Sequence, residues 1–176
     1  MAGARRAGSS ATFWLLLVVA GNETTRHLIA NSLLALAERP ALRRLADDGA
    51  THPAAVEDLL RWVSPVTQFR RTATRDTELA GRPIAAGDKV VLYYAAANRD
   101  PAVFTDPDVL DAAREANPHL AFGIGPHFCL GSHLVRLEAR ALLAALRPAL
   151  RLRGAPVRLE SSFVNRLKAL PLRLAG

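Results

Sequence analysis

The only cysteine of this 176-residue chain, Cys129, lies in the glycine-rich stretch FGIGPHFCLG, residues 122–131. Glycines at 123 and 125 permit tight left-handed turns before the sulfur, and Gly131 lets the following chain pass close to a flat ligand. At the start of a helix, free N–H groups and the helix dipole stabilise a thiolate. A lone thiolate presented in this way indicates an axial ligand to haem iron and oxygen activation. The ordinary alternative is a small buried hydrophobe before a helix.

A second candidate site interrupts a long apolar segment near the N-terminus. The run AGNETT, residues 20–25, places a glycine, an acid and two threonines in the middle of this segment. A glycine inside a helix costs about 1 kcal/mol relative to alanine, and a buried carboxylate needs a partner. An acid beside a hydroxyl suits proton transfer. The alternative is a helix that tolerates one glycine and whose threonines bond to the preceding turn.

The cysteine stretch resembles the signature of the cytochrome P450 haem-thiolate monooxygenases, Phe-Gly-x-Gly-x-basic-x-Cys-x-Gly. Every defined position is matched, with His127 at the basic position. The resemblance implies that Cys129 is the axial ligand of haem b (iron protoporphyrin IX) and that His127 faces a haem propionate. It also implies that four further residues form the cofactor loop: Phe122, Gly123, Gly125 and Gly131.

Residues 20–25 resemble the oxygen-binding groove of the central P450 helix. By that resemblance, Ala20 and Gly21 leave space for dioxygen over the haem. Thr24 would hydrogen-bond the oxygen, and Glu23 would lie on the proton route. Thr24 and Glu23 are therefore the predicted catalytic residues.

The segment AVEDLLRW resembles the P450 helix that carries a buried Glu-x-x-Arg ion pair. Here Asp58 stands at the glutamate position and Arg61 at the arginine position, while Glu57 is also within i,i+4 reach of Arg61. In the later segment DPDVL, Val109 occupies the place where the family usually supplies a third basic partner. Because a buried charge without partners is costly, these two departures predict a weakened network.

Arg71 matches the arginine that binds a haem propionate in the family, with Arg70 as the neighbouring candidate. A guanidinium group can bond both carboxylate oxygens, although a solvent-facing strand arginine is the ordinary alternative. Residues 63–69 and 162–165 match segments that line the substrate pocket, and their apolar side chains favour a hydrophobic, lipid- or terpenoid-like substrate. The resemblance further implies dioxygen and a ferredoxin-like electron donor with its reductase.

Periodicity and chain breakers predict the elements that position these residues. Helical spacing predicts helices at 11–38, 40–47, 53–63 and 133–146. Strand and turn signals predict a small sheet between 69 and 92, a loop over 97–120 and a β-rich tail from 150. The fold class is mainly α with a small β-sheet. We expect disorder over residues 1–10 and a partial P450 domain over 11–176, the C-terminal portion of that fold with its N-terminal half absent.

The net charge of +7 raises the possibility of nucleic-acid binding. All but two of the basic residues are arginines, scattered along the chain without interleaved aromatics, so we expect no nucleic-acid partner. A docking surface for an acidic protein fits better. A single cysteine excludes an internal disulfide and favours the cytoplasm.

The N-terminus resembles a secretory signal, because two arginines precede the apolar run 13–19. The helical pattern continues beyond Ala20 without a break, however, so one long helix is the better interpretation. The apolar run is too short for a membrane span. Because P450 family members carry most of their helices upstream of these motifs, we expect a truncated monooxygenase. The alternatives are a haem-binding fragment without turnover and a basic helical interaction protein without a cofactor.

Overall fold

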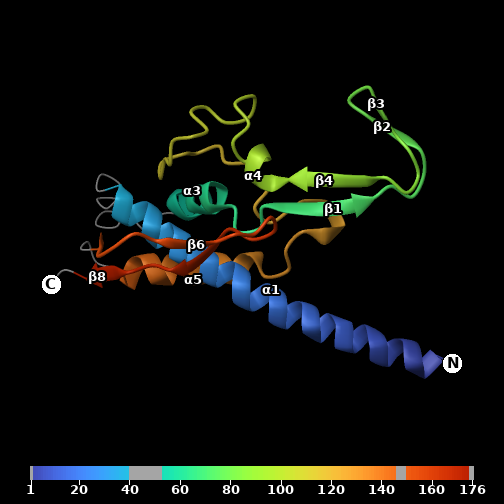
Figure 1. Ribbon diagram of the computed structural model, residues 1–176, viewed down its shortest axis with the longest axis horizontal. Coiled ribbons are helices and arrows are strands. Elements are labelled where there is room, and N and C mark those ends of the chain that lie inside the picture. The colour runs from blue at the N-terminus through green and yellow to red at the C-terminus, as the bar shows by residue number, and fades with distance from the viewer. Residues whose placement is uncertain (1, 40–52, 146–149, 175–176) are drawn as a thin grey trace.

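The computed structural model describes residues 2–39, 53–145 and 150–174. A long helix, α1 (Ala2–Glu38), runs diagonally across the view, and its N-terminal end extends well beyond the other elements (Figure 1). Helices α3 (Pro53–Val63) and α5 (Ser132–Ala145) pack against α1 and against each other. The three helices predicted at 11–38, 53–63 and 133–146 are therefore confirmed. The helix predicted at 40–47 lies outside the described residues.

The first helix begins earlier than the sequence predicts. Residues from Ala2 onward are helical, whereas disorder was expected over residues 1–10. Alanine and arginine are among the strongest helix formers, and residues 2–7 contain five of them in AGARRA. Local propensity is thus sufficient to extend α1 to the start of the described chain.

The strands form four antiparallel pairs. Between α3 and the cysteine loop, β1 (Gln68–Thr72) pairs with β4 (Lys89–Tyr93), and β2 (Thr77–Leu79) pairs with β3 (Arg82–Ile84). In the tail, β5 (Leu150–Leu152) pairs with β8 (Leu172–Leu174), and β6 (Val157–Leu159) pairs with β7 (Arg166–Ala169). The predicted small sheet and β-rich tail are both confirmed.

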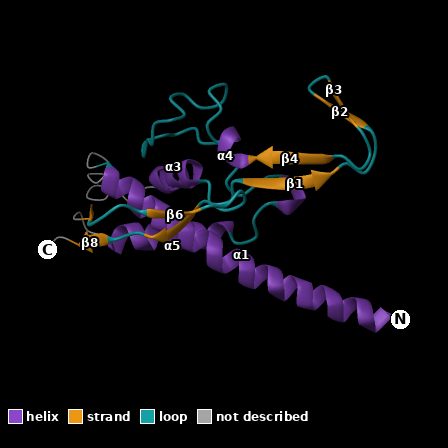
Figure 2. Cartoon of the chain, in the orientation of Figure 1, coloured by secondary structure: helices purple, strands orange, loops and turns teal. Residues whose placement is uncertain are grey.

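A short helix, α4 (Tyr94–Ala97), follows β4 and was not predicted. The chain then runs as a long irregular segment to the 3-10 turn η1 (Gly125–His127), as Figure 2 shows by its colouring. This segment agrees with the loop predicted over 97–120. It folds back onto α3 through hydrogen bonds to Asp58 and Arg61.

The apolar core lies where the C-terminal half of α1 meets α3 and α5. Its buried members include Leu28, Leu36, Val56, Leu60, Val63, Leu110, Ala139 and Leu143. The N-terminal half of α1 differs, since its apolar side chains from Phe13 to Val19 are exposed. This half extends away from the other described elements (Figure 1). None of the helices in the described part of the chain is long and apolar enough to cross a bilayer.

Candidate active site

Cys129 lies between the turn η1 and helix α5, as the sequence predicts. Gly123 and Gly125 have φ angles of +70° and +74°, in the left-handed region that favours glycine. The Cys129 N–H donates to the Phe122 carbonyl oxygen at 3.0 Å, which closes the loop. The thiol is only partly buried, and a Cβ on Gly131 would lie 4.0 Å from its Sγ. The loop thus presents a free sulfur at an accessible position.

Several apolar residues of the cysteine loop expose their side chains. Ile124 is 76% exposed and Leu130 is 78% exposed, while Phe128 is half exposed. Phe122 is partly buried, and its ring is edge-to-face with that of Phe128 at a centroid distance of 6.1 Å. A patch of this kind next to a thiol is a surface on which a flat apolar ligand can rest.

The two predicted propionate ligands are both exposed. His127 lies in η1 and Arg71 in β1, and neither has an acidic partner among the described residues. Tyr94 connects their two segments. Its ring lies 5.8 Å from that of Phe69 in β1, and its Oη would be 3.3 Å from a Cβ on Gly123.

The predicted oxygen groove lies on the partly exposed middle of α1. A Cβ added to Gly21 would meet no atom within 4 Å, so this position opens onto free space. Ala20 is also exposed. The Thr24 hydroxyl donates to the Ala20 carbonyl oxygen at 2.6 Å, which is the back-bond expected of a threonine in a helix. That bond leaves the lone pairs of Oγ1 available.

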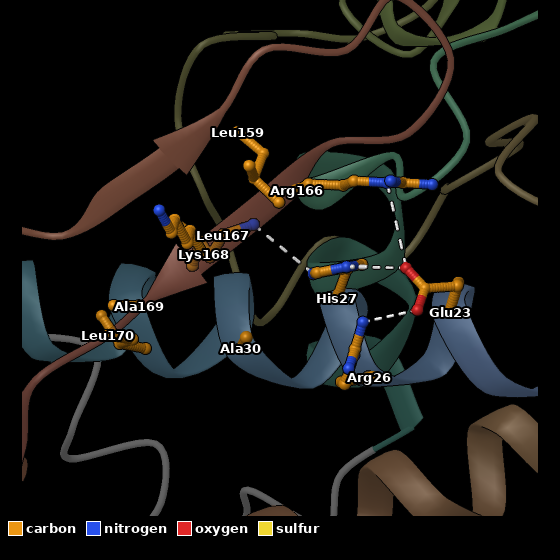
Figure 3. A pocket seen from close by; sticks show the side chains of 10 residues that line it. All are labelled: Glu23, Arg26, His27, Ala30, Leu159, Arg166, Leu167, Lys168, Ala169 and Leu170. Carbon is orange, nitrogen blue, oxygen red and sulfur yellow. Dashed lines mark hydrogen bonds and ion pairs between the residues drawn. The ribbon is translucent and has the colours of Figure 1, made fainter.

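Glu23 lies in a cavity of about 600 Å³ between α1 and β7 (Figure 3). Its Oε1 accepts from Arg26 at 2.5 Å, and its Oε2 lies 3.2 Å from His27 Nε2 and 3.9 Å from Arg166 Nε. Desolvation raises the pKa of the Glu23 carboxyl, but Arg26, His27 and Arg166 together outweigh it and lower the pKa below its ordinary value. The carboxylate is therefore held ionised by a cationic and hydrogen-bonding shell that the sequence did not predict.

Arg61 is fully buried in α3, and each of its N–H groups has an acceptor. Its Nε donates to Asp58 Oδ1 at 2.5 Å, which confirms the predicted Asp58–Arg61 pair. The other donors reach Asp58 Oδ2 and the carbonyl oxygens of Asn98, Pro107 and Val109. Since the side chain of Val109 is exposed, this position serves the network through its backbone.

The prediction of a weakened network is wrong. Asp58 also accepts from Arg114 Nε at 2.9 Å, from Asn117 Nδ2 at 3.1 Å and from the Asp111 N–H at 2.6 Å. Arg114 supplies the third basic partner that Val109 lacks. The loop sequence has no periodic signal for this contact, and only the absence of a basic residue at position 109 pointed to the need for one.

The i,i+4 spacing allowed a pair between Glu57 and Arg61, but the structure pairs Glu57 with other residues. Its carboxylate instead forms a two-pronged bond with Arg136 of α5, at 2.6 and 2.7 Å, and accepts from His119 Nε2 at 3.0 Å. Partial burial raises the pKa of Glu57, but the bonds from Arg136 and His119 prevail and lower it to about 2. The Arg136 guanidinium lies 4.6 Å from the Phe122 ring centroid. Glu57 therefore ties α3 to the cysteine loop.

The two segments predicted to line a substrate pocket lie side by side. Val66 and Val164 form a β-bridge, and the Thr67 N–H donates to the Phe163 carbonyl oxygen at 2.9 Å. The rings of Phe69 and Phe163 meet edge-to-face at 5.4 Å. The structure thus brings together two stretches that are far apart in the sequence.

Comparison with known proteins decides the family. A family model described as Cytochrome P450 matches residues 52–153. This chain belongs to the cytochrome P450 family. It is 49% identical over 168 residues to the methyl-branched lipid omega-hydroxylase of Mycobacterium tuberculosis, covering 92% of this chain and 39% of that P450.

Solved P450 structures share the fold. CYP109E1 from Bacillus megaterium, in complex with testosterone, gives a TM-score of 0.88 at 40% identity over 93% of this chain and 47% of that one. P450BioI, in complex with acyl carrier protein ligated to hexadec-9Z-enoic acid, gives 0.87 at 41% identity over 91% and 43%. The chain thus spans under half the length of these relatives, consistent with the C-terminal portion of the P450 fold.

The P450 family implies a haem cofactor, and the residues of this chain fit one. The thiol of Cys129 is free and accessible, Gly131 leaves space beside it, and exposed apolar side chains flank it. Two basic side chains without an acidic partner among the described residues, His127 and Arg71, suit the propionate groups. The donor set is that of a haem-thiolate centre.

Proposed function

We propose that this chain forms the haem-binding part of a P450 monooxygenase that hydroxylates a hydrophobic, lipid- or terpenoid-like substrate. The observation that carries the proposal is the accessible thiol of Cys129. The loop that holds it is closed by the hydrogen bond from the Cys129 backbone N–H to the Phe122 carbonyl oxygen. Dioxygen is the co-substrate, and a ferredoxin-like protein with its reductase supplies electrons. We place the protein in the cytoplasm, since Cys129 must stay reduced to act as a ligand.

The proposed haem site uses residues from three elements. Cys129 supplies the axial thiolate, while His127 of η1 and Arg71 of β1 hold the propionates. Ala20 and Gly21 of α1 would leave room for dioxygen, because a Cβ at Gly21 meets no atom within 4 Å. A thiolate-ligated haem supplies the activation of dioxygen for insertion into a C–H bond.

In this proposal, protons for the reaction pass through two neighbouring side chains of α1. Glu23 Oε1 and Oε2 take up a proton from the solvent side, where the cavity next to β7 opens. Thr24 Oγ1 accepts a proton through a free lone pair and releases its own hydroxyl proton, which turns away from the Ala20 carbonyl oxygen to be passed on. The lowered pKa of Glu23 means that the carboxyl rests in its ionised form.

The substrate class follows from the apolar segments 63–69 and 162–165, which contact each other through Phe69 and Phe163. The aromatic and aliphatic side chains at this junction would suit an apolar molecule. The names of the relatives support the same class, since one is a hydroxylase of methyl-branched lipids and another was solved with an acyl chain.

The test is product formation by haem-loaded protein with a ferredoxin and reductase pair and a methyl-branched fatty acid. Mass spectrometry should detect a product that has gained one oxygen atom. Thr24→Ala should lower its yield about 10²-fold, because a positioned proton donor is lost. Thr77→Ala, on the distant β2 strand, serves as the matched control. A haem-loaded protein that forms no product would support haem binding without turnover instead.

A further inference from the structure

We propose that His27 is a positioning residue that fixes the Glu23 carboxylate on the side of α1 that faces β7. The proposal rests on the proposed function, in which Glu23 handles protons. It assigns His27 no contact with substrate or haem. Figure 3 shows the arrangement, with His27 between Glu23 on its own helix and Leu167 on the strand above.

Hydrogen bonds at both ring nitrogens define the tautomer of His27. The side chain is only 3% exposed, and its Nδ1 accepts from the Leu167 backbone N–H at 3.4 Å. A nitrogen that accepts must carry a lone pair, so the ring proton lies on Nε2. Nε2 is 3.2 Å from Glu23 Oε2 and therefore donates to it. The backbone of β7 thus orients the ring, and the ring orients the carboxylate.

The other groups that face Glu23 are suited to neutralise its charge rather than to fix its direction. Arg26 bonds the carboxylate, but its side chain is 61% exposed. Arg166 lies 3.9 Å away, and Lys168 lines the same cavity from β7. Exposed ion pairs are screened by water and geometrically loose. Among these groups, His27 is the buried one that is also anchored at its far side.

The anchor is itself firmly placed. Leu167 is 7% exposed in the core, and the residues around it are bonded to α1. The Asn31 Nδ2 donates both to the His27 carbonyl oxygen at 2.9 Å and to the Asn165 carbonyl oxygen at 3.0 Å. Rotation of the His27 ring would therefore break its hydrogen bond to the Leu167 N–H, because β7 is held in place by its bonds to α1.

The first test is made on the unmodified full chain and needs no variant to fold. Nitrogen-15 NMR of the imidazole groups reports which ring nitrogen carries the proton. We expect His27 to show a protonated Nε2 and an unprotonated Nδ1. A proton on Nδ1 would overturn the proposal, because Nε2 could then donate nothing to Glu23.

The second test compares two amides that differ by one methylene. In His27→Gln the amide can reach the position of Nε2 and donate to Glu23, whereas in His27→Asn it can reach only the position of Nδ1. Carboxyl carbon-13 NMR should show the pKa of Glu23 raised towards its ordinary value in His27→Asn and unchanged in His27→Gln. Equal behaviour of the two variants would overturn the proposal.

These measurements need neither haem nor turnover, so a negative result can be distinguished from a failure of the proposed function. If His27 carries its proton on Nδ1 in a chain whose haem site works, only the proposed role of His27 is refuted. If His27 carries its proton on Nε2 but the chain forms no thiolate-ligated haem, the proposed function is refuted and the positioning of Glu23 by His27 still holds.

Discussion

At the scale of single residues, Asp58 is the centre of a network of buried polar groups. Its side chain is 0% exposed and bonds Arg61, Arg114, Asn117 and the Asp111 N–H. The network connects α3 to the irregular segment that leads to the cysteine loop. We therefore expect its integrity to control both stability and the placement of Cys129.

Asp58→Asn keeps the shape of the side chain and removes its charge. Two arginines would then lose their buried counter-charge, so we expect the free energy of unfolding to fall by about 3–5 kcal/mol. Urea denaturation measures this. Asp108→Asn is the matched control, because Asp108 is 85% exposed, lies 3.6 Å from Arg99, and should contribute less than about 0.5 kcal/mol. Equal effects of the two variants would contradict the account.

Glu57 makes stability depend on acid pH. Its folded pKa of about 2 is below the ordinary value of 4.5, so the ionised carboxylate stabilises the fold above pH 4.5. This contribution, about 2 kcal/mol after allowance for solvent screening, is lost as the pH falls from 4.5 towards 2. Glu57→Gln should remove that part of the pH dependence in denaturation curves recorded between pH 6 and 2.5. An unchanged slope would show that Glu57 is not a stabilising carboxylate.

The sequence predicted the ion pair within one helix of these networks but not the partners that come from other parts of the chain. Asp58–Arg61 was predicted from spacing within one helix, where geometry is local. Arg114 and Arg136 were missed because each reaches α3 from a distant part of the chain, through contacts that no periodic pattern encodes. Spacing within the helix offered Glu57 a pairing with Arg61, and packing of α5 against α3 selected Arg136 instead.

At the scale of elements, two glycines with different backbone conformations predict opposite effects of the same substitution. Gly21 lies within α1 with open space around its Cβ position, so Gly21→Ala should stabilise by up to about 1 kcal/mol. Gly125 has φ +74°, so Gly125→Ala should destabilise by about 1–2 kcal/mol despite equal space. Thermal denaturation of both variants measures these effects. The same sign for both would contradict the described backbone.

Elements with strong periodicity or clear breakers were predictable. Helices α1, α3 and α5 and the β1–β4 pair follow from apolar spacing, prolines and turn residues. The short helix α4 was missed because four residues carry no periodic signal. The path of the loop before η1 depends on hydrogen bonds to buried charges in α3, which local sequence does not reveal.

At the scale of the whole molecule, the N-terminal half of α1 presents a continuous apolar surface. Trp14 is 67% exposed, Leu15 65% and Val18 61%. The described chain provides no element that covers this surface. Whether such a helix is buried depends on neighbours that its own sequence cannot specify.

This surface should make the isolated chain associate. Large exposed apolar patches favour self-association, so sedimentation should show species that grow with protein concentration. Leu15→Gln should reduce this association. Leu79→Gln is the control, because it makes the same substitution at a leucine that is 62% exposed in the β2–β3 hairpin, outside the patch. This control variant should not reduce the association. A monomer at all concentrations, or equal effects of both variants, would contradict this expectation.

The central claim is that Cys129 coordinates haem iron. The direct measurement is the absorbance spectrum of the chain loaded with haemin, reduced and exposed to carbon monoxide, with Cys129→Ser as the control. The account predicts a strongly red-shifted Soret band in the unmodified chain that disappears in the variant, because the thiolate alone causes the shift. The same spectrum in both proteins, or an unshifted band in the unmodified chain, would contradict it.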